Sequence, residues 1–205
     1  MTGTGATPVI FILASASPRR LELLGRLGVV PDSVDPADCD ETPHRDEPPL
    51  AYARRIAAEK AQVVAMRHAG SIILSADTVV AAGRRILGKA ETEDDARVCL
   101  ALLSGRRHRV HSAVTVVDAE GRARHRVSTS TLAFKRLSAR EIDAYVASGE
   151  WQGKAGGYAV QGYAEAFVRT LTGSHSGVMG LPLYETASLL MGEGFPLHFS
   201  WGNLA

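Results

Sequence analysis

Residues 9–20 read Val-Ile-Phe-Ile-Leu-Ala-Ser-Ala-Ser-Pro-Arg-Arg, and they join an expected strand to an expected helix. The first five are apolar and rich in β-branched side chains, which predicts a short buried strand. Ser17 suits an N-cap and Pro18 the first helical position. Arg19 and Arg20 then fall in the first turn, where the helix dipole disfavours cations. A bound anion would reverse that cost, so this corner predicts a phosphate site; the alternative is that both arginines extend into water.

The composition is that of a soluble globular protein. The chain has 205 residues, of which 45% are hydrophobic and 22% charged, with a formal net charge of +1. This length suffices for one domain with a full core, and we treat residues 1–205 as a single domain, with two small ones as the alternative. The chain lacks the basic excess of a nucleic-acid-binding protein, so no stable nucleic-acid partner is expected.

Two features predict a cytoplasmic setting. Cys39 and Cys99 lie far apart and give neither a disulfide framework nor a zinc spacing, which is typical of a reducing compartment. Residues 1–8 lack the basic start of a signal peptide, and the apolar run 9–14 is too short for a membrane span. We therefore expect a cytoplasmic protein with no membrane partner.

The chain mixes helix and strand signals without a regular βαβ repeat. Helices are expected to follow Ser17 and to cover residues 52–68, 92–103, 138–149 and 182–190, two of them opened by the capping boxes Thr92–Asp95 and Ser138–Glu141. Strands are expected over residues 71–80, 86–87, 108–117, 127–134 and 166–171, with one short strand inside the loop 31–49. An α+β fold with a mixed sheet fits this order better than a parallel Rossmann unit.

Asp77 interrupts the most strand-like run of the chain, Ser-Ile-Ile-Leu-Ser-Ala-Asp-Thr-Val-Val over residues 71–80. A buried carboxylate must be hydrogen-bonded, paired or bound to a metal, because leaving it isolated is costly. The alternative, a strand-end residue facing solvent, is less favoured because two valines follow it. Together with Glu41, Asp77 would suit a hard cation such as Mg²⁺, which takes oxygen ligands and bridges phosphates.

Three further signals are weaker when taken alone. Residues 83–89 have the spacing of a phosphate-binding loop, but Ala90 stands where that loop needs a hydroxyl for magnesium, so a strand is expected instead. Lys89 can still reach a phosphate from the strand end. Lys60 lies in a helical segment, where a lysine is ordinarily a surface residue. Gln161 can read a base edge through its amide or, alternatively, bond to nearby backbone.

Taken together, these motifs resemble those of the Maf family of nucleoside triphosphate pyrophosphatases. The matching blocks follow the family's order and comprise Leu13–Arg20, Ser75–Thr78, Leu87–Lys89, Leu103–Arg106, Lys154–Tyr158, Val160–Gly162 and Gly180–Leu183. Ser75 replaces a usual glycine, and residues 163–165 replace a glycine-rich step. The resemblance covers nearly the whole chain.

The resemblance implies a specific reaction and fold. Proteins of this family hydrolyse nucleoside triphosphates to the monophosphate and pyrophosphate with a divalent cation, Mg²⁺ or Mn²⁺. They have an elongated α+β fold with two lobes around a central cleft, and they commonly form homodimers. The glutamine of Val-Gln-Gly resembles the subgroup that acts on dTTP and UTP, so these and modified pyrimidine nucleotides are the expected substrates. Removal of noncanonical nucleotides is the cellular role that the resemblance suggests.

The resemblance also assigns roles to individual residues. The family's proton acceptor falls on Asp77, and its substrate-selecting positions fall on Arg19, Thr78 and Gln161. Phosphate-binding positions fall on Ser15, Arg20, Lys60 and Lys89, while Glu41 joins Asp77 at the metal. Two alternatives stay open: another preferred substrate such as 7-methyl-GTP, or a non-enzymatic regulator of septum formation that binds nucleotides or nucleic acid.

Overall fold

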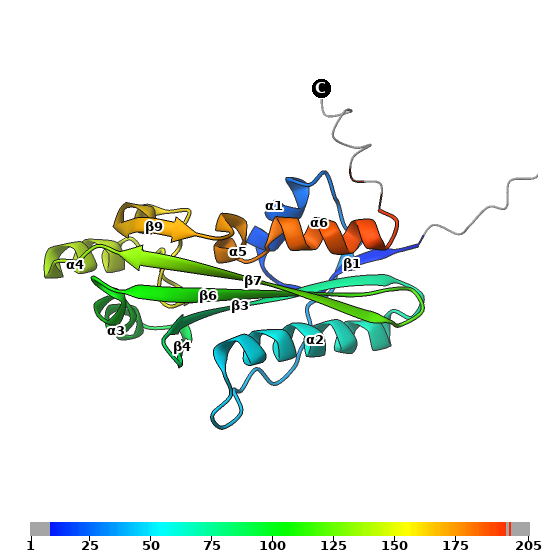
Figure 1. The fold of residues 1–205 in the computed structure, drawn as a ribbon, viewed down its shortest axis with the longest axis horizontal. Coiled ribbons are helices and arrows are strands. Elements are labelled where there is room, and N and C mark those ends of the chain that lie inside the picture. Colours follow the sequence, from blue (N-terminus) through cyan, green and yellow to red (C-terminus); the bar gives the residue numbers. More distant parts are fainter. Residues whose placement is uncertain (1–8, 196, 198–205) are drawn as a thin grey trace, which may run out of the picture.

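A mixed sheet forms the centre of the computed structural model, which describes residues 9–195 and 197. The strand order is β2-β1-β3-β6-β7-β9, with β4 also paired to β3 (Figure 1). β1 (Phe11–Leu13) runs parallel to β2 (Ser33–Val34) and β3 (Ile72–Ala82), while the other pairs are antiparallel. The expected α+β fold with a mixed sheet is therefore confirmed.

Most of the expected elements are present within a few residues of their predicted bounds. The remaining strands are β4 (Arg85–Leu87), β5 (Lys89–Ala90), β6 (Arg107–Val117), β7 (Ala123–Phe134), β8 (Lys154–Ala155) and β9 (Val168–Thr172). The helices are α1 (Pro18–Gly25), α2 (Pro49–Arg67), α3 (Glu93–Leu103), α4 (Ala139–Ala147), α5 (His175–Met179), α6 (Leu183–Gly192) and the 3₁₀ helix η1 (Tyr163–Phe167). Both capping boxes form as expected.

The differences lie in short elements. The small sheet formed by β5 and β8, the helix α5 and the helix η1 were not expected from the sequence. Residues 166 and 167, expected to begin a strand, belong to η1, so the strand starts at Val168. These elements are too short to show a hydrophobic period, which explains why the pattern did not reveal them. Residues 1–8, where no signal peptide is expected, lie outside the described part of the chain.

Helices cover both faces of the sheet. Helix α2 packs along one face of β3 and β6, and α1, α5 and α6 lie on the opposite side (Figure 1). Side chains of β3 alternate between the two faces: Ile73 and Val79 pack in the clusters that contain α2 residues, whereas Leu74 and Val80 belong to the larger core. None of the described helices is long and apolar enough to cross a membrane.

One edge of β3 has a gap in its pairing. β1 pairs with Ile72, Ile73 and Leu74, and β4 pairs with the far end of the strand from Val80 onward. Within the described residues, no strand pairs with positions 75–79 on this edge. The chain leaves β1 after Leu13 and turns toward α1, so the strand-to-helix corner opens beside the middle of β3.

Candidate active site

A cavity of about 510 Å³ lies at this gap, between the β1–α1 corner and the small β5–β8 sheet. Its wall is built from the β1–α1 corner, β3, α2, β5, the region around β8 and the turn after α5. All nine residues that the sequence singled out line it, namely Ser15, Arg19, Arg20, Glu41, Lys60, Asp77, Thr78, Lys89 and Gln161. The fold thus brings together side chains from six separate stretches of sequence, while their individual roles stay predictions.

Lys60 lies at the acidic end of the cavity and is buried, with 8% of its surface exposed. The ordinary expectation of a surface lysine is therefore wrong for this position. Its Nζ lies 2.8 Å from Asp77 Oδ1 and 2.9 Å from Glu41 Oε1, so one ammonium group binds both carboxylates. Lys89 Nζ lies 3.8 Å from the other oxygen of Glu41.

The charges around Glu41 favour its ionised form. Burial raises the pKa of Glu41, but the hydrogen bond from Lys60 and the charges of Lys60, Lys89 and Arg20 outweigh that effect and lower it below its usual value. Glu41 is thus placed to act as an oxygen ligand.

A hydrogen-bond network fixes the loop that carries Glu41. The Tyr52 hydroxyl donates to the Glu41 backbone carbonyl at 2.6 Å. Arg55 donates to both carboxylate oxygens of Glu47, at 2.8 and 2.7 Å, and to the Thr42 carbonyl at 3.1 Å. The hydrogen bonds from Arg55 lower the pKa of Glu47 to about 2. Tyr52 and Arg55 were not expected at the site, because nothing in their spacing shows that this loop folds back onto α2.

The strand-to-helix corner holds Arg20 in a fixed position. Ser17 occupies the N-cap of α1, but its side chain makes no capping bond. Instead, the Ser15 hydroxyl accepts from the Ser17 backbone N–H at 3.2 Å and from Arg20 Nη1 at 3.0 Å. Arg20 Nε donates to the Gly180 carbonyl at 2.9 Å. Desolvation lowers the pKa of Arg20, and the charge of Asp77 opposes that shift. Arg20 is therefore directed toward the cavity and does not simply extend into water.

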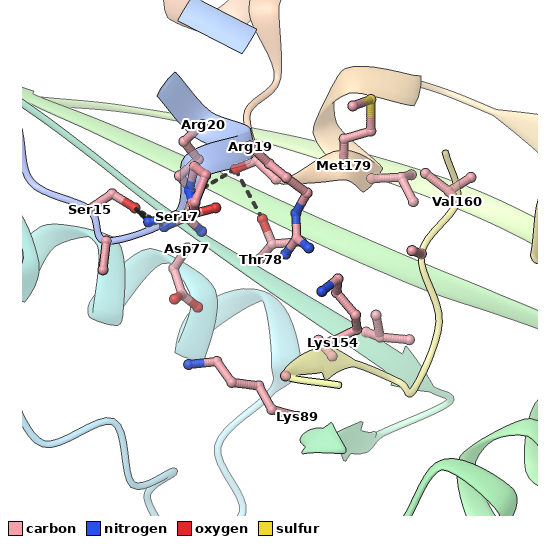
Figure 2. A pocket seen from close by; sticks show the side chains of 18 of the residues that line it. Ser15, Ser17, Arg19, Arg20, Asp77, Thr78, Lys89, Lys154, Val160 and Met179 are labelled. Carbon is pink, nitrogen blue, oxygen red and sulfur yellow. Dashed lines mark hydrogen bonds between the residues drawn. The ribbon is translucent and has the colours of Figure 1, made fainter. Parts of the chain in front are cut away.

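The residues expected to select the substrate lie on different walls. Thr78 Oγ1 lies 3.2 Å from Ser112 Oγ and donates to the Gly180 carbonyl at 3.4 Å. Gln161 is exposed on the cavity wall, and within the described residues its amide has no hydrogen-bond partner, so the alternative of an amide bonded to backbone is not observed. Apolar side chains of Val160 and Met179 line the wall beyond Thr78 (Figure 2).

The small β5–β8 sheet contributes two lysines to the cavity. Lys89 lies on β5, so residues 83–89 form a turn and strands and not a phosphate-binding loop. Lys154 lies on β8, and its side chain extends into the cavity (Figure 2). Lys154 begins one of the motifs described above, but no role was expected for it; the two glycines that follow, Gly156 and Gly157, were the available signal.

The carboxylates of the site suit a metal ion that binds together with a substrate. Among the described residues, no group of three or more His, Cys, Asp or Glu side chains is placed to hold a metal ion. Glu41 and Asp77 nevertheless converge on one position, now taken by the Lys60 ammonium group. Mg²⁺ is usually held by one or two carboxylates together with substrate phosphates, so these two acids fit such an ion.

Four cationic side chains from the N-terminal half, two carboxylates and the hydroxyls of Ser15 and Thr78 thus line one cavity, and such cations are the groups that proteins use to bind phosphates. Residues 10–193 match the family model described as Maf-like protein, and the chain belongs to the Maf family. It is 62% identical over 189 residues to a dTTP/UTP pyrophosphatase of Zymomonas mobilis, covering 92% of this chain and 94% of the relative.

A second relative supports the same family assignment. A dTTP/UTP pyrophosphatase of Caulobacter vibrioides is 60% identical over 184 residues, covering 90% of this chain and 95% of the relative. Among solved structures, a HAM1 protein from Coxiella burnetii aligns with a TM-score of 0.49 and 18% identity, covering 90% of this chain and 99% of that one.

Proposed function

We propose that this protein is an enzyme that hydrolyses dTTP and UTP to the nucleoside monophosphate and pyrophosphate. One observation carries the proposal: a buried acid, Asp77, faces a cavity lined by cations at a gap in the sheet. The names of relatives with 60% identity or more over most of the chain support the same reaction. Modified pyrimidine triphosphates belong to the same substrate class.

The chemistry follows from the arrangement of charge. Asp77 Oδ1 accepts from Lys60, which leaves Oδ2 to accept the proton of a water molecule that attacks the α-phosphorus. Arg20, Lys60 and Lys89 neutralise the negative charge that develops on the leaving pyrophosphate. When bound, a divalent cation such as Mg²⁺ or Mn²⁺, held by Glu41 and Asp77, would add positive charge at the phosphates.

Replacing Asp77 with asparagine tests this assignment. We expect Asp77→Asn to lower pyrophosphate release from UTP by roughly 10²–10⁴-fold, the range attributed to general-base catalysis. The matched control is Asp94→Asn, an exposed carboxylate in the first turn of α3, which should keep its activity. Full activity of Asp77→Asn would rule out the proposed role, and binding of UTP by the variant shows that the fold is retained.

A panel of nucleotides with pyrophosphate detection separates this proposal from its alternatives. We expect dTTP and UTP to be hydrolysed faster than 7-methyl-GTP, and a chelator to stop the reaction. Gln161→Ala should reduce the preference for pyrimidines, because the free amide on the cavity wall is placed to meet a base edge. A regulator without enzymatic activity would instead bind DNA with a steep salt dependence and release no pyrophosphate.

The proposal also covers the domain organisation, the oligomeric state and the location of the enzyme. We expect residues 1–205 to form one domain, and the protein to act as a homodimer in the cytoplasm. Light scattering coupled to gel filtration measures the mass in solution, and a mass of one chain, 21.8 kDa, would contradict the dimer.

A further inference from the structure

Four of the five cationic side chains that line the cavity fall into two groups that differ in their partners. Lys60 and Lys89 face the carboxylates, Lys60 contacting both of them and Lys89 lying 3.8 Å from Glu41. Arg19 and Lys154 have no such balance: among the described residues neither forms an ion pair with an acid. The cavity therefore has one end where cations and carboxylates are paired and one region where two cations lie without a directly paired acid.

Arg19 and Lys154 lie close enough to repel each other. Burial lowers the pKa of Lys154, the charge of Arg19 lowers it further, and Glu150 raises it. Burial also lowers the pKa of Arg19. The two side chains come from opposite walls, α1 and β8, and their charged groups approach each other across the cavity (Figure 2). Two like charges this close repel each other when no anion lies between them. A bound anion would attract both and make the arrangement favourable.

Lys154 retains donors for a ligand. Its Nζ donates to the Gln152 carbonyl at 2.9 Å, which positions the side chain and leaves other N–H groups free. Its strand is tied to the site by the β5–β8 pairing, in which Lys154 lies opposite Ala90 and Lys89 lies opposite Ala155. Lys154 and Lys89 are thus carried by one small unit but serve different parts of the cavity.

The order of side chains along the cavity gives the direction of a bound nucleotide. Val160 and Met179 line one end, Arg19 and Lys154 the middle and Lys89 the other end, with Asp77 between the middle and Lys89 (Figure 2). An apolar wall suits a base and cationic side chains suit phosphates. We propose that Arg19 and Lys154 bind the α-phosphate, between the base and the pyrophosphate. This assignment rests on the proposed function and adds Lys154 to the residues that contact the substrate.

If this assignment is right, the two products of the reaction should depend on different lysines for their binding. The α-phosphate stays on the nucleoside monophosphate, whereas the β- and γ-phosphates leave as pyrophosphate. Loss of the Lys154 charge should therefore weaken binding of UMP and spare binding of pyrophosphate. Loss of the Lys89 charge should have the opposite effect, because Lys89 lies at the acidic end where the leaving group is expected.

Calorimetric titration of the full-length protein with UMP and with pyrophosphate tests this split. A hydrogen bond to a charged group contributes enough to change a dissociation constant by about tenfold or more. We expect Lys154→Met to weaken UMP about tenfold and pyrophosphate less than twofold, and Lys89→Met to show the reverse pattern. Lys154→Arg should recover most of the UMP affinity, since it restores the charge.

Each outcome bears on the proposal. Equal or greater loss of pyrophosphate binding in Lys154→Met would move the residue to the leaving-group end and overturn the assignment, and so would unchanged binding of both products. Circular dichroism shows whether Lys154→Met is folded. If it is not, the product affinities of Lys154→Arg and Lys154→Gln are compared instead. Product binding needs no turnover, so an inactive wild-type protein would refute the proposed function while the UMP titration still decides the role of Lys154.

Discussion

Replacing Lys60 with methionine removes an ammonium group while keeping a side chain of similar length. Lys60 and Asp77 lie 2.8 Å apart, and both side chains are only 10% exposed. Removing one partner of a buried ion pair typically costs about 3–5 kcal/mol, because the other charge is left uncompensated. Asp77 lines the cavity and keeps some access to water, so we expect the lower value, about 3 kcal/mol. Glu41 is 38% exposed and adds little to this cost.

Urea and thermal unfolding measure this effect directly. A loss of about 3 kcal/mol corresponds to a fall in Tm of roughly 6–12 °C for a chain of this size. The double variant Lys60→Met/Asp77→Asn should recover part of the loss, because it removes the stranded charge along with its partner. Mg²⁺ should stabilise Lys60→Met more than the wild type, since the Lys60 ammonium group then no longer occupies the position between the two carboxylates. Wild-type stability in Lys60→Met would refute the inference that this ammonium group neutralises the site.

Two other predictions concern residues outside the reaction centre. Burial lowers the pKa of His108 to about 4, so between pH 6.5 and 4 the unfolded chain binds a proton that the folded chain does not. Stability should therefore fall by about 3 kcal/mol as the pH drops through this window, and His108→Gln should lose that dependence in urea unfolding curves. Tyr52→Phe removes a hydrogen bond to the Glu41 backbone worth about 1 kcal/mol, so the Mg²⁺ concentration for half-maximal activity should rise about fivefold. Tyr163→Phe, at an exposed tyrosine, is its control, and an unchanged metal requirement in Tyr52→Phe would contradict the positioning role.

Local signals were sufficient for much of the fold. The capping boxes at Thr92 and Ser138 form as expected, because their bonds join residues three positions apart. Both strands of the β6–β7 hairpin were also expected, since each is a contiguous run of strand-forming residues in sequence. By contrast, the β5–β8 pairing joins Lys89 to Ala155. Each of these strands has only two residues, which is too few to show a hydrophobic period in the sequence.

The residues that form the candidate site were predictable from the sequence, but the contacts between them were not. Motifs named nine of the residues that line the cavity, including Asp77. The burial of Lys60 was not predictable, because the acids that compensate its charge come from a distant loop and a neighbouring strand. The role of Tyr52 was hidden for the same reason: its hydroxyl meets the chain eleven residues earlier, across a loop without a regular pattern.

The missing strand partner beside the middle of β3 also exposes main-chain groups. Alternate residues of a strand direct their amide and carbonyl groups to the same side. Since the Leu74 carbonyl accepts from Ala14, the corresponding groups of Ala76 and Thr78 face the opening. A ligand that hydrogen-bonds to these groups would be recognised through the main chain. The amide and carbonyl groups of the main chain remain when a side chain is replaced. Part of the affinity for such a ligand should therefore survive changes of side chain at Thr78, whereas a substitution that shifts the backbone of β3 would lose it.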